Sequence, residues 1–357
     1  MRKSAGRIGL ISMALTLALA LPSFPSDTTK TLWSKSSFGT NDYFHEPSDI
    51  EVDGARSLIY IVDTGSNRVL VFDFQGEFLR AIGNKGQGPG EFMRATGACL
   101  IPEGGLAVAD FGNNRIQVFD PAGKFVRSIT STEARVADLV FSEGKFFTVP
   151  SFGASGYVIT RGSQEKSQPL VNVLDEQGKK ISEISVADFP ETQPFVRAIK
   201  HRVSLALSPR GRLFLPHFAV NLVQVFEKTG EKIGGFSRPL PFKPVAPALI
   251  DQRSPEPGVV QMRATLDIVN AAARFGPDGK LYILTATESL AERLKKTPDL
   301  RDSTPLRFDV VDPESYQVVR IIPCDPGVRA FGLMEGGRLV YVYEDAEGEL
   351  SLKCVQY

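Results

Sequence analysis

The chain has 357 residues, in which 41 lysines and arginines balance 41 aspartates and glutamates, so its formal net charge is zero. This neutrality argues against a nucleic-acid-binding protein, which normally carries a basic excess or a basic face. Three histidines and three cysteines leave little material for a zinc site or a disulfide framework. Cys324 and Cys354 could form a disulfide in an oxidising compartment, although buried free thiols are the simpler expectation.

The N-terminal segment has the pattern of a secretory signal peptide. Three basic residues precede an apolar run from Ile8 to Leu21, which is too short to span a membrane comfortably. Ala18 and Ala20 provide small residues at the spacing that a signal peptidase needs. We therefore expect residues 1–26 to be a signal peptide that directs export to the periplasm or the extracellular space, with an uncleaved anchor as the alternative.

A sequence motif is then repeated along the chain. The residues from Asp63 to Phe78 read DTGSNRVLVFDFQGEF, and those from Asp110 to Phe125 read DFGNNRIQVFDPAGKF, at a constant offset of 47 residues. Runs of β-branched and aromatic residues such as SLIYIVD predict short strands, and the residues between them are typical of tight turns. Four antiparallel strands joined by short turns form one small sheet, and copies at a spacing of about 40–50 residues are typical of β-propeller blades.

Weaker copies extend this pattern to the C-terminus. The segment from Asn221 to Glu231 matches that from Asn67 to Glu77, and strand–turn–strand units recur at Leu205, Ala273 and Gly332. The sequence therefore predicts six four-stranded blades, whose first strands begin near Pro47, Arg94, Arg135, Arg202, Asn270 and Arg329.

The sixth blade has enough chain for only three strands. A strand around Leu32–Phe38 precedes the first blade, and we expect it to complete the last blade so that the ring has no free sheet edge. The predicted fold is an all-β, six-bladed β-propeller over residues 27–357, closed by this N-terminal strand. The same reading places insertions at 151–168, 237–269 and 287–305, of which the last contains a predicted short helix with the sequence SLAERLKK.

The first two blades resemble the NHL repeat of bacterial six-bladed propellers. The resemblance rests on FGNNRIQVFDPAGKFVRSI and on GNKGQGPGEF before it, and it extends to the fourth blade. It implies that the Asp and the Asn-Arg of a DxxxNR motif shape turns and bridge blades; the matching residues are Asp63, Asn67, Arg68, Asp110, Asn114 and Arg115. In the fourth copy His217 and Leu222 replace the Asp and the Arg, and a lone histidine there is expected to be structural.

Loop lengths indicate which face of the propeller is functional. The turns between the first and second strands are uniformly short, whereas every long loop precedes a first strand or joins a second strand to a third, on the opposite face. Six residues just before the first strands are predicted to surround the channel mouth on that face: His45, Arg94, Arg135, Arg202, Asn270 and Arg329. Four aromatic residues are candidates for holding an apolar or sugar group nearby: Tyr43, Phe44, Phe195 and Phe331.

The arginines in this ring predict a binding function. A guanidinium binds a carboxylate or a phosphate through paired hydrogen bonds, and a concave channel mouth strengthens the attraction. We therefore expect an exported binding or interaction module for an anionic small molecule, an acidic peptide or another exported protein. The alternative interpretation is that the arginines pair with carboxylates of the chain itself, such as Glu133, Asp138 or Asp267.

An enzyme is the competing class of function. Some six-bladed propellers are calcium-dependent lactonases or zinc lyases, which hold their cation with several carboxylate, Asn or His side chains where the first strands begin. Here those positions are mostly Arg, which would repel a cation, and the sequence contains no GxSxG or HExxH motif. We expect no metal and no cofactor, and keep a metal-dependent hydrolase or lyase with a site in the central channel as the alternative.

Overall fold

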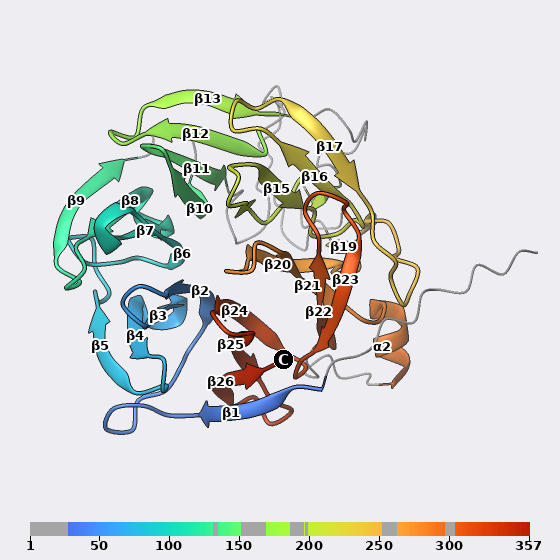
Figure 1. Ribbon diagram of the computed structural model, residues 1–357, viewed down its shortest axis with the longest axis horizontal. Coiled ribbons are helices and arrows are strands. Elements are labelled where there is room, and N and C mark those ends of the chain that lie inside the picture. The colour runs from blue at the N-terminus through green and yellow to red at the C-terminus, as the bar shows by residue number, and fades with distance from the viewer. Residues whose placement is uncertain are drawn as a thin grey trace, which may run out of the picture.

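The computed structural model is a ring of six four-stranded antiparallel sheets around a central axis (Figure 1). It describes residues 28–130, 135–150, 169–185, 199–251, 263–296 and 304–357, together with Val196. The predicted signal peptide and the insertion at 151–168 lie outside the described residues. The six-bladed β-propeller is confirmed, and none of the helices in the described part of the chain is both long and apolar enough to cross a membrane.

The first three blades each consist of four consecutive strands. Blade 1 contains β2 (Pro47–Asp53), β3 (Leu58–Asp63), β4 (Arg68–Asp73) and β5 (Phe78–Ile82). Blade 2 contains β6 (Ala95–Leu100), β7 (Leu106–Asp110), β8 (Arg115–Phe119) and β9 (Phe125–Thr130). Blade 3 contains β10 (Val136–Ser142), β11 (Lys145–Pro150), β12 (Val171–Asp175) and β13 (Lys180–Ile184).

Blades 4 and 5 follow the same order but carry additions. Blade 4 contains β14 (Ala206–Leu207), β15 (Leu213–Pro216), β16 (Val223–Phe226) and β17 (Lys232–Phe236). Blade 5 contains β20 (Asn270–Phe275), β21 (Leu281–Ala286), β22 (Leu306–Val311) and β23 (Val318–Pro323). The insertion between them forms a hairpin of β18 (Ala248–Asp251) and β19 (Arg263–Thr265), and the predicted short helix is α2 (Leu290–Lys296).

Hydrophobic patterning explains why the sheets stack. Strand β3 reads LIYIVD and is almost wholly buried, because neighbouring blades cover both of its faces, whereas β5 at the periphery alternates buried and exposed positions. The described residues form six hydrophobic clusters, and each cluster draws its side chains from two adjacent blades. A single blade therefore cannot bury its own faces, and stability depends on a complete ring.

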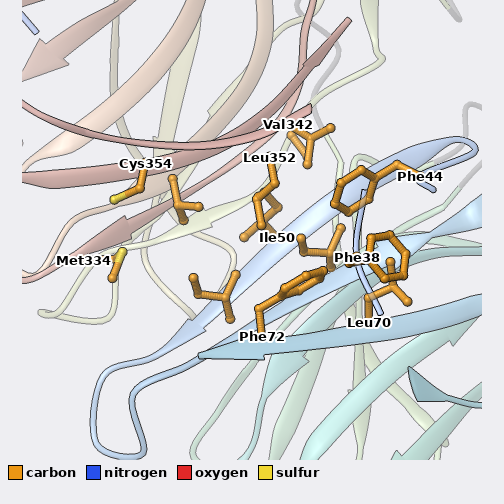
Figure 2. Packing of buried hydrophobic residues seen from close by; sticks show 13 residues of the cluster. Phe38, Phe44, Ile50, Leu70, Phe72, Met334, Val342, Leu352 and Cys354 are labelled. Atoms are coloured by element: carbon orange, nitrogen blue, oxygen red, sulfur yellow. The ribbon is translucent and has the colours of Figure 1, made fainter. Parts of the chain in front are cut away.

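Ring closure follows the predicted scheme. Blade 6 contains β24 (Val328–Met334), β25 (Arg338–Glu344) and β26 (Leu350–Gln356), and β1 (Lys30–Lys35) pairs antiparallel with β26 as its fourth strand. Figure 2 shows the hydrophobic cluster at the seam, which combines Phe38 and Phe44 with Ile50, Leu70 and Phe72 of blade 1 and with Met334, Val342, Leu352 and Cys354 of blade 6. All three cysteines are free, as the composition suggested.

Trp33 gives β1 a second attachment, to blade 1. Its indole N–H donates to the backbone oxygen of Phe74 at 3.1 Å, and its ring covers Gly76, which has a φ of +79°. A Cβ at position 76 would lie 2.8 Å from the Trp33 ring, so the close approach requires glycine. One strand thus joins blade 6 by backbone pairing and blade 1 by a side chain.

Replacing this tryptophan should loosen the ring. Trp33→Ala removes the indole contacts and the bond to Phe74, and we expect it to lower the free energy of unfolding by about 2–4 kcal/mol, because a large, partly buried aromatic group is lost. Leu32→Ala is the matched control, since Leu32 is on the same strand but 43% exposed. Equal unfolding midpoints for the two variants in denaturant titrations would show that Trp33 does not contribute to closure.

Candidate functional site

The Asp residues of the repeated motif fasten the loops that lead into the first strands. In blade 1, Asp63 Oδ1 accepts the backbone N–H groups of His45 and Glu46 at 2.9 and 3.0 Å, and Arg68 Nε lies 3.3 Å from its Oδ2. In blade 2, Asp110 accepts the backbone N–H of Met93 and the Nε–H of Arg115, both at 2.7 Å. The motif therefore has the architectural role that was expected of it.

In blades 1 and 4 the Asn of the motif binds the backbone of the segment that follows its blade. Asn67 adopts a left-handed conformation with a φ of +56°, and its Oδ1 accepts the backbone N–H of Arg94 at 2.6 Å. In blade 4, Asn221 makes the corresponding pair of bonds with the backbone N–H and C=O of Arg238, at 3.2 and 2.7 Å. His217, which replaces the Asp, is buried, and its Nδ1 donates to the backbone oxygen of Lys200 at 2.7 Å, so it is structural.

Two of the predicted ring arginines stack on aromatic rings. Arg135 and Arg202 are exposed on the face that carries the long loops, hereafter the long-loop face. Their guanidinium carbons lie 5.3 Å from the ring centroid of Phe111 and 4.2 Å from that of Phe218, respectively. In the described part of the chain no carboxylate pairs with Arg135. Phe111 and Phe218 directly follow the Asp and the His of the repeated motif, and this shared position could have revealed both from sequence.

The other exposed members of the ring have polar partners. Arg94 lies 4.0 Å from Glu46, and Arg329 forms an ion pair with Glu344. The Nδ1 of His45 lies 2.8 Å from the hydroxyl of Ser66. The carboxylates of Asp138 and Asp267, which were expected as alternative partners of the arginines, accept backbone N–H groups. Glu133 lies outside the described residues.

Asn270 is placed differently from these five residues. It is buried, its Nδ2 donates to the backbone oxygens of His217 and Val220 at 2.6 and 3.1 Å, and its Oδ1 accepts from Arg238. Arg238 is itself buried and also donates to Thr285 and Asp309, so burial lowers its pKa to about 10 without discharging it. The sequence analysis did not identify this network, although an Asp inside the buried strand β22 was a signal for it.

The aromatic candidates also divide into exposed and buried residues. Tyr43 is 50% exposed and remains on the surface. The interpretation of Phe44 and Phe331 as surface aromatics is wrong, since Phe44 packs in the seam cluster and Phe331 packs against Phe308 at a centroid distance of 4.8 Å. Phe195 lies outside the described residues.

The central channel holds an acidic cluster that the sequence analysis missed. Asp49 and Glu51 on β2 and Asp138 on β10 lie close to Arg274 on β20, which forms an ion pair with Asp49 and whose Nε lies 3.6 Å from Glu51. Asp49 also accepts the backbone N–H of Ala98 at 2.9 Å, and so joins blades 1, 2 and 5. The alternation of acidic residues in SDIEVD places both carboxylates on one side of β2 and was the available signal.

Charge and burial oppose each other in this cluster. Burial would lower the pKa of Arg274, but the nearby carboxylates of Asp49, Asp138 and Glu51 outweigh it and raise that pKa. Burial raises the pKa of Glu51 to about 8 and that of Asp138 to about 6, because one guanidinium cannot neutralise three desolvated carboxylates. In the described part of the chain no group of three or more His, Cys, Asp or Glu side chains is arranged to hold a metal ion.

The channel opens into a cavity of ≈ 600 Å³ on the face that carries the short turns. Its walls come from the turns of five blades, among them those at Gly54, Gly211 and Gly276. Two basic residues in its lining form ion pairs, Lys228 with Glu143 and Arg210 with Glu314, the latter at 2.6 Å. The exposed arginines of the predicted ring and this cavity therefore lie on opposite faces.

The buried carboxyls should make stability depend on pH. In the unfolded chain Glu51 loses its proton near its ordinary pKa of 4.5, whereas in the folded protein it keeps the proton until about pH 8. Between these two pH values the folded state therefore binds more protons than the unfolded state. The stabilisation that Glu51 contributes is complete below about pH 4.5 and is lost as the pH rises through 8.

As the pH rises from about 4.5 to about 8, we expect the thermal unfolding midpoint to fall less for the Glu51→Gln variant than for the wild type. Thermal unfolding followed by circular dichroism at a series of pH values measures the difference. Glu335→Gln, which removes an exposed carboxylate on the short-turn face, is the control and should follow the wild type. If Glu51→Gln also runs parallel to the wild type, Glu51 is ionised in the folded protein.

Comparisons with known proteins agree with this architecture. A family model described as a 6-bladed beta-propeller (DUF5128) matches residues 40–198, which is less than half of the chain. No curated protein matches. Among solved structures, a member of the DUF4221 family from Bacteroides vulgatus is similar at a TM-score of 0.59 and 10% identity, over 93% of this chain and 97% of that chain.

Two further solved structures are similar to this chain in fold, again at low sequence identity. U3-55K is similar at a TM-score of 0.55 and 12% identity, over 92% of this chain and 98% of that chain. The β-propeller domain of Cps50 (Swd1) from Myceliophteria thermophila is similar at a TM-score of 0.51 and 10% identity, over 92% of this chain and 100% of that chain. At such identities the likeness concerns the fold alone, and this chain folds as a six-bladed β-propeller.

Proposed function

We propose that the protein is an exported binding module whose long-loop face takes an anionic ligand, either an acidic small molecule or an acidic segment of a peptide or protein. The observation that carries the proposal is the stacking of Arg135 and Arg202 on Phe111 and Phe218. Both arginines are exposed, and each stands just before the first strand of its blade.

Stacking prepares a guanidinium for an anion. A ring beneath the planar group restricts the rotamers of the arginine, so less entropy is lost when a carboxylate binds. The guanidinium then forms paired, charge-assisted hydrogen bonds with the carboxylate. Arginines held in this way on neighbouring blades support recognition of anions rather than of neutral ligands.

Arg94 and Arg329 supply further positive charge on this face. Both side chains are about half exposed, and their partners Glu46 and Glu344 are on the surface or partly buried. Exposed ion pairs contribute only about 0–1 kcal/mol, so a ligand carboxylate can replace the protein carboxylate at little cost. These two arginines therefore act as secondary contacts for a larger acidic ligand.

Calorimetric titration with inorganic phosphate and with a hexaglutamate peptide tests the proposal. We expect wild-type protein to bind at least one of these probes with a Kd below about 1 mM, and the double variant Arg135→Ala/Arg202→Ala to lose that binding because its two paired contacts are gone. Arg320→Ala, which removes an exposed arginine from the outer strand β23, is the control and should bind as the wild type does.

Two outcomes would contradict the proposal. One is that neither anion binds the wild type more tightly than millimolar. The other is that the double variant binds as well as the wild type. Calcium and zinc belong in a parallel thermal-shift screen, because stabilisation by calcium alone would favour the alternative of a metal-dependent hydrolase or lyase.

Export is the second part of the proposal. It rests on the basic start, the short apolar run and the small residues of the segment 1–26, and it predicts cleavage near Ala20–Ser26. N-terminal sequencing of the protein recovered from its native cells decides the question. Full-length chain recovered from the cytosol would contradict export.

The proposal also assigns the repeats to the NHL type. Support comes from the equivalent contacts of Asp63 and Asp110, which each hold the loop before a first strand, and from the blade-to-blade bond of Asn67. These contacts give a structural role to the Asp of both copies and to the Asn of the first copy.

A further inference from the structure

The cavity on the short-turn face is large enough for a small molecule. Its volume of ≈ 600 Å³ falls within the range of about 300–1,000 Å³ that ligand pockets usually have. It equals the volume of roughly twenty water molecules at about 30 Å³ each. Blades 1, 3, 4, 5 and 6 line it, and in the described part of the chain blade 2 contributes no residue to the lining.

Apolar side chains at the ends of the inner strands form part of the wall. Val52 of β2, Leu207 of β14 and Phe275 of β20 are partly exposed, and the buried residues Leu333 and Met334 of β24 belong to the same lining. An apolar ligand group that displaces water from such side chains gains free energy in proportion to the area that it covers. The wall therefore favours a ligand with an apolar body.

The charged groups of the lining leave one carboxylate over. The basic residues Arg210 and Lys228 pair with Glu314 and Glu143, respectively. Glu335 is exposed, and in the described part of the chain its carboxylate has neither an ion-pair partner nor a hydrogen bond. Among the described residues, the lining therefore offers an uncompensated negative charge and no uncompensated positive charge.

The turn that carries Glu335 is held through its backbone. Arg338 Nε donates to the backbone oxygen of Glu335 at 3.1 Å, and Gln356 Nε2 donates to those of Gly336 and Gly337 at 2.7 and 3.0 Å. These bonds fix the turn without engaging the Glu335 carboxylate. A ligand cation can therefore pair with that carboxylate without first breaking a contact of the protein.

The channel behind the cavity reinforces the preference for a cation. Glu51 and Arg274 directly precede Val52 and Phe275, which line the cavity. Both belong to the channel cluster, in which three carboxyl groups share one guanidinium. The cluster stays negatively charged even while Glu51, whose pKa burial raises to about 8, keeps its proton. Low-dielectric walls focus such a field and raise the local concentration of cations.

We propose that this cavity is a binding site for a small organic ammonium ion, whose apolar body packs on Val52, Leu207 and Phe275 and whose charged end pairs with Glu335. The apolar wall supplies most of the affinity by burial, and the carboxylate fixes the orientation of the ligand. The site lies on the face opposite the exposed arginines of the predicted ring, so it does not depend on the proposed function.

A series of amines tests the apolar wall. In calorimetric titrations at neutral pH with butylamine, hexylamine and octylamine, we expect the affinity of the wild type to rise by about threefold to fourfold for each added methylene group, because each one leaves water for the cavity. Octylamine should reach a Kd below about 1 mM. Hexanol, which has the same chain but no charge, should bind about twofold to fivefold more weakly than hexylamine.

Substitutions of Glu335 test the charged contact. Glu335→Gln should lower the affinity for hexylamine by about twofold to fivefold, to that for hexanol, because an exposed ion pair contributes modestly. Glu335→Asp keeps the carboxylate and should keep the preference for hexylamine. Glu103→Gln is the matched control, since Glu103 is exposed in the blade 2 turn of the same face and does not line the cavity.

Two neighbouring substitutions test the location of the site. Gly54 lines the cavity, its φ lies outside the left-handed region, and a Cβ there would meet no atom within 4 Å. Gly54→Trp should therefore occupy part of the cavity without displacing the chain, and lower the affinity for octylamine by at least about tenfold. Ala55→Trp is the control, because Ala55 is exposed in the same turn but does not line the cavity. Unfolding midpoints show whether each variant is folded during the titrations.

Three results would overturn the assignment. The first is that the wild type binds octylamine no more tightly than millimolar. The second is that hexylamine and hexanol bind equally well, or that Glu335→Gln leaves the preference for hexylamine unchanged. The third is that Gly54→Trp, while folded, binds octylamine as Ala55→Trp does. Binding of phosphate and hexaglutamate should be the same in all these variants as in the wild type, and its absence from the wild type would contradict the proposed function alone.

Discussion

The structure depends on one pairing, that of β1 with β26. Every blade buries its two faces against its neighbours, so an open ring would leave an apolar face exposed on each side of the gap. Because β1 comes from the other end of the chain, the last blade is complete only when the two ends meet. The loops of both faces, and the channel between them, keep their positions only while that seam is closed.

Sequence reasoning succeeded where the information was local. The 47-residue offset, the short turns and the β-branched runs predicted six blades, and β2 and β20 begin at Pro47 and Asn270 as expected. Strand β14 begins later than predicted, at Ala206, because the chain before it makes only an isolated bridge between Val203 and His217. The strands and turns of a blade follow from residues within one repeat, and the repeat shows the order in which they occur.

The side-chain networks could not be predicted because they join distant positions. Arg274 and Asp49 are 225 residues apart, and their contact follows from the curvature of the ring rather than from any spacing in the sequence. Asn270 has the same place in its repeat as the exposed arginines have in theirs. It is nevertheless buried, because Arg238 from the preceding insertion lies against it. A repeat shows where a residue stands in its blade, but it does not show what an insertion will cover.

The position of β1 also has a consequence for the order of folding. Strand β1 is made first but has no strand to pair with until β26, the last strand, is available. Five blades are composed of consecutive strands and can form from neighbouring segments, whereas the sixth must wait for a contact that spans nearly the whole chain. Contacts of such long range form slowly because the entropy of loop closure must be overcome first. The N-terminal strand therefore acts as a latch, and the ring closes only after the last strand of the chain has been produced.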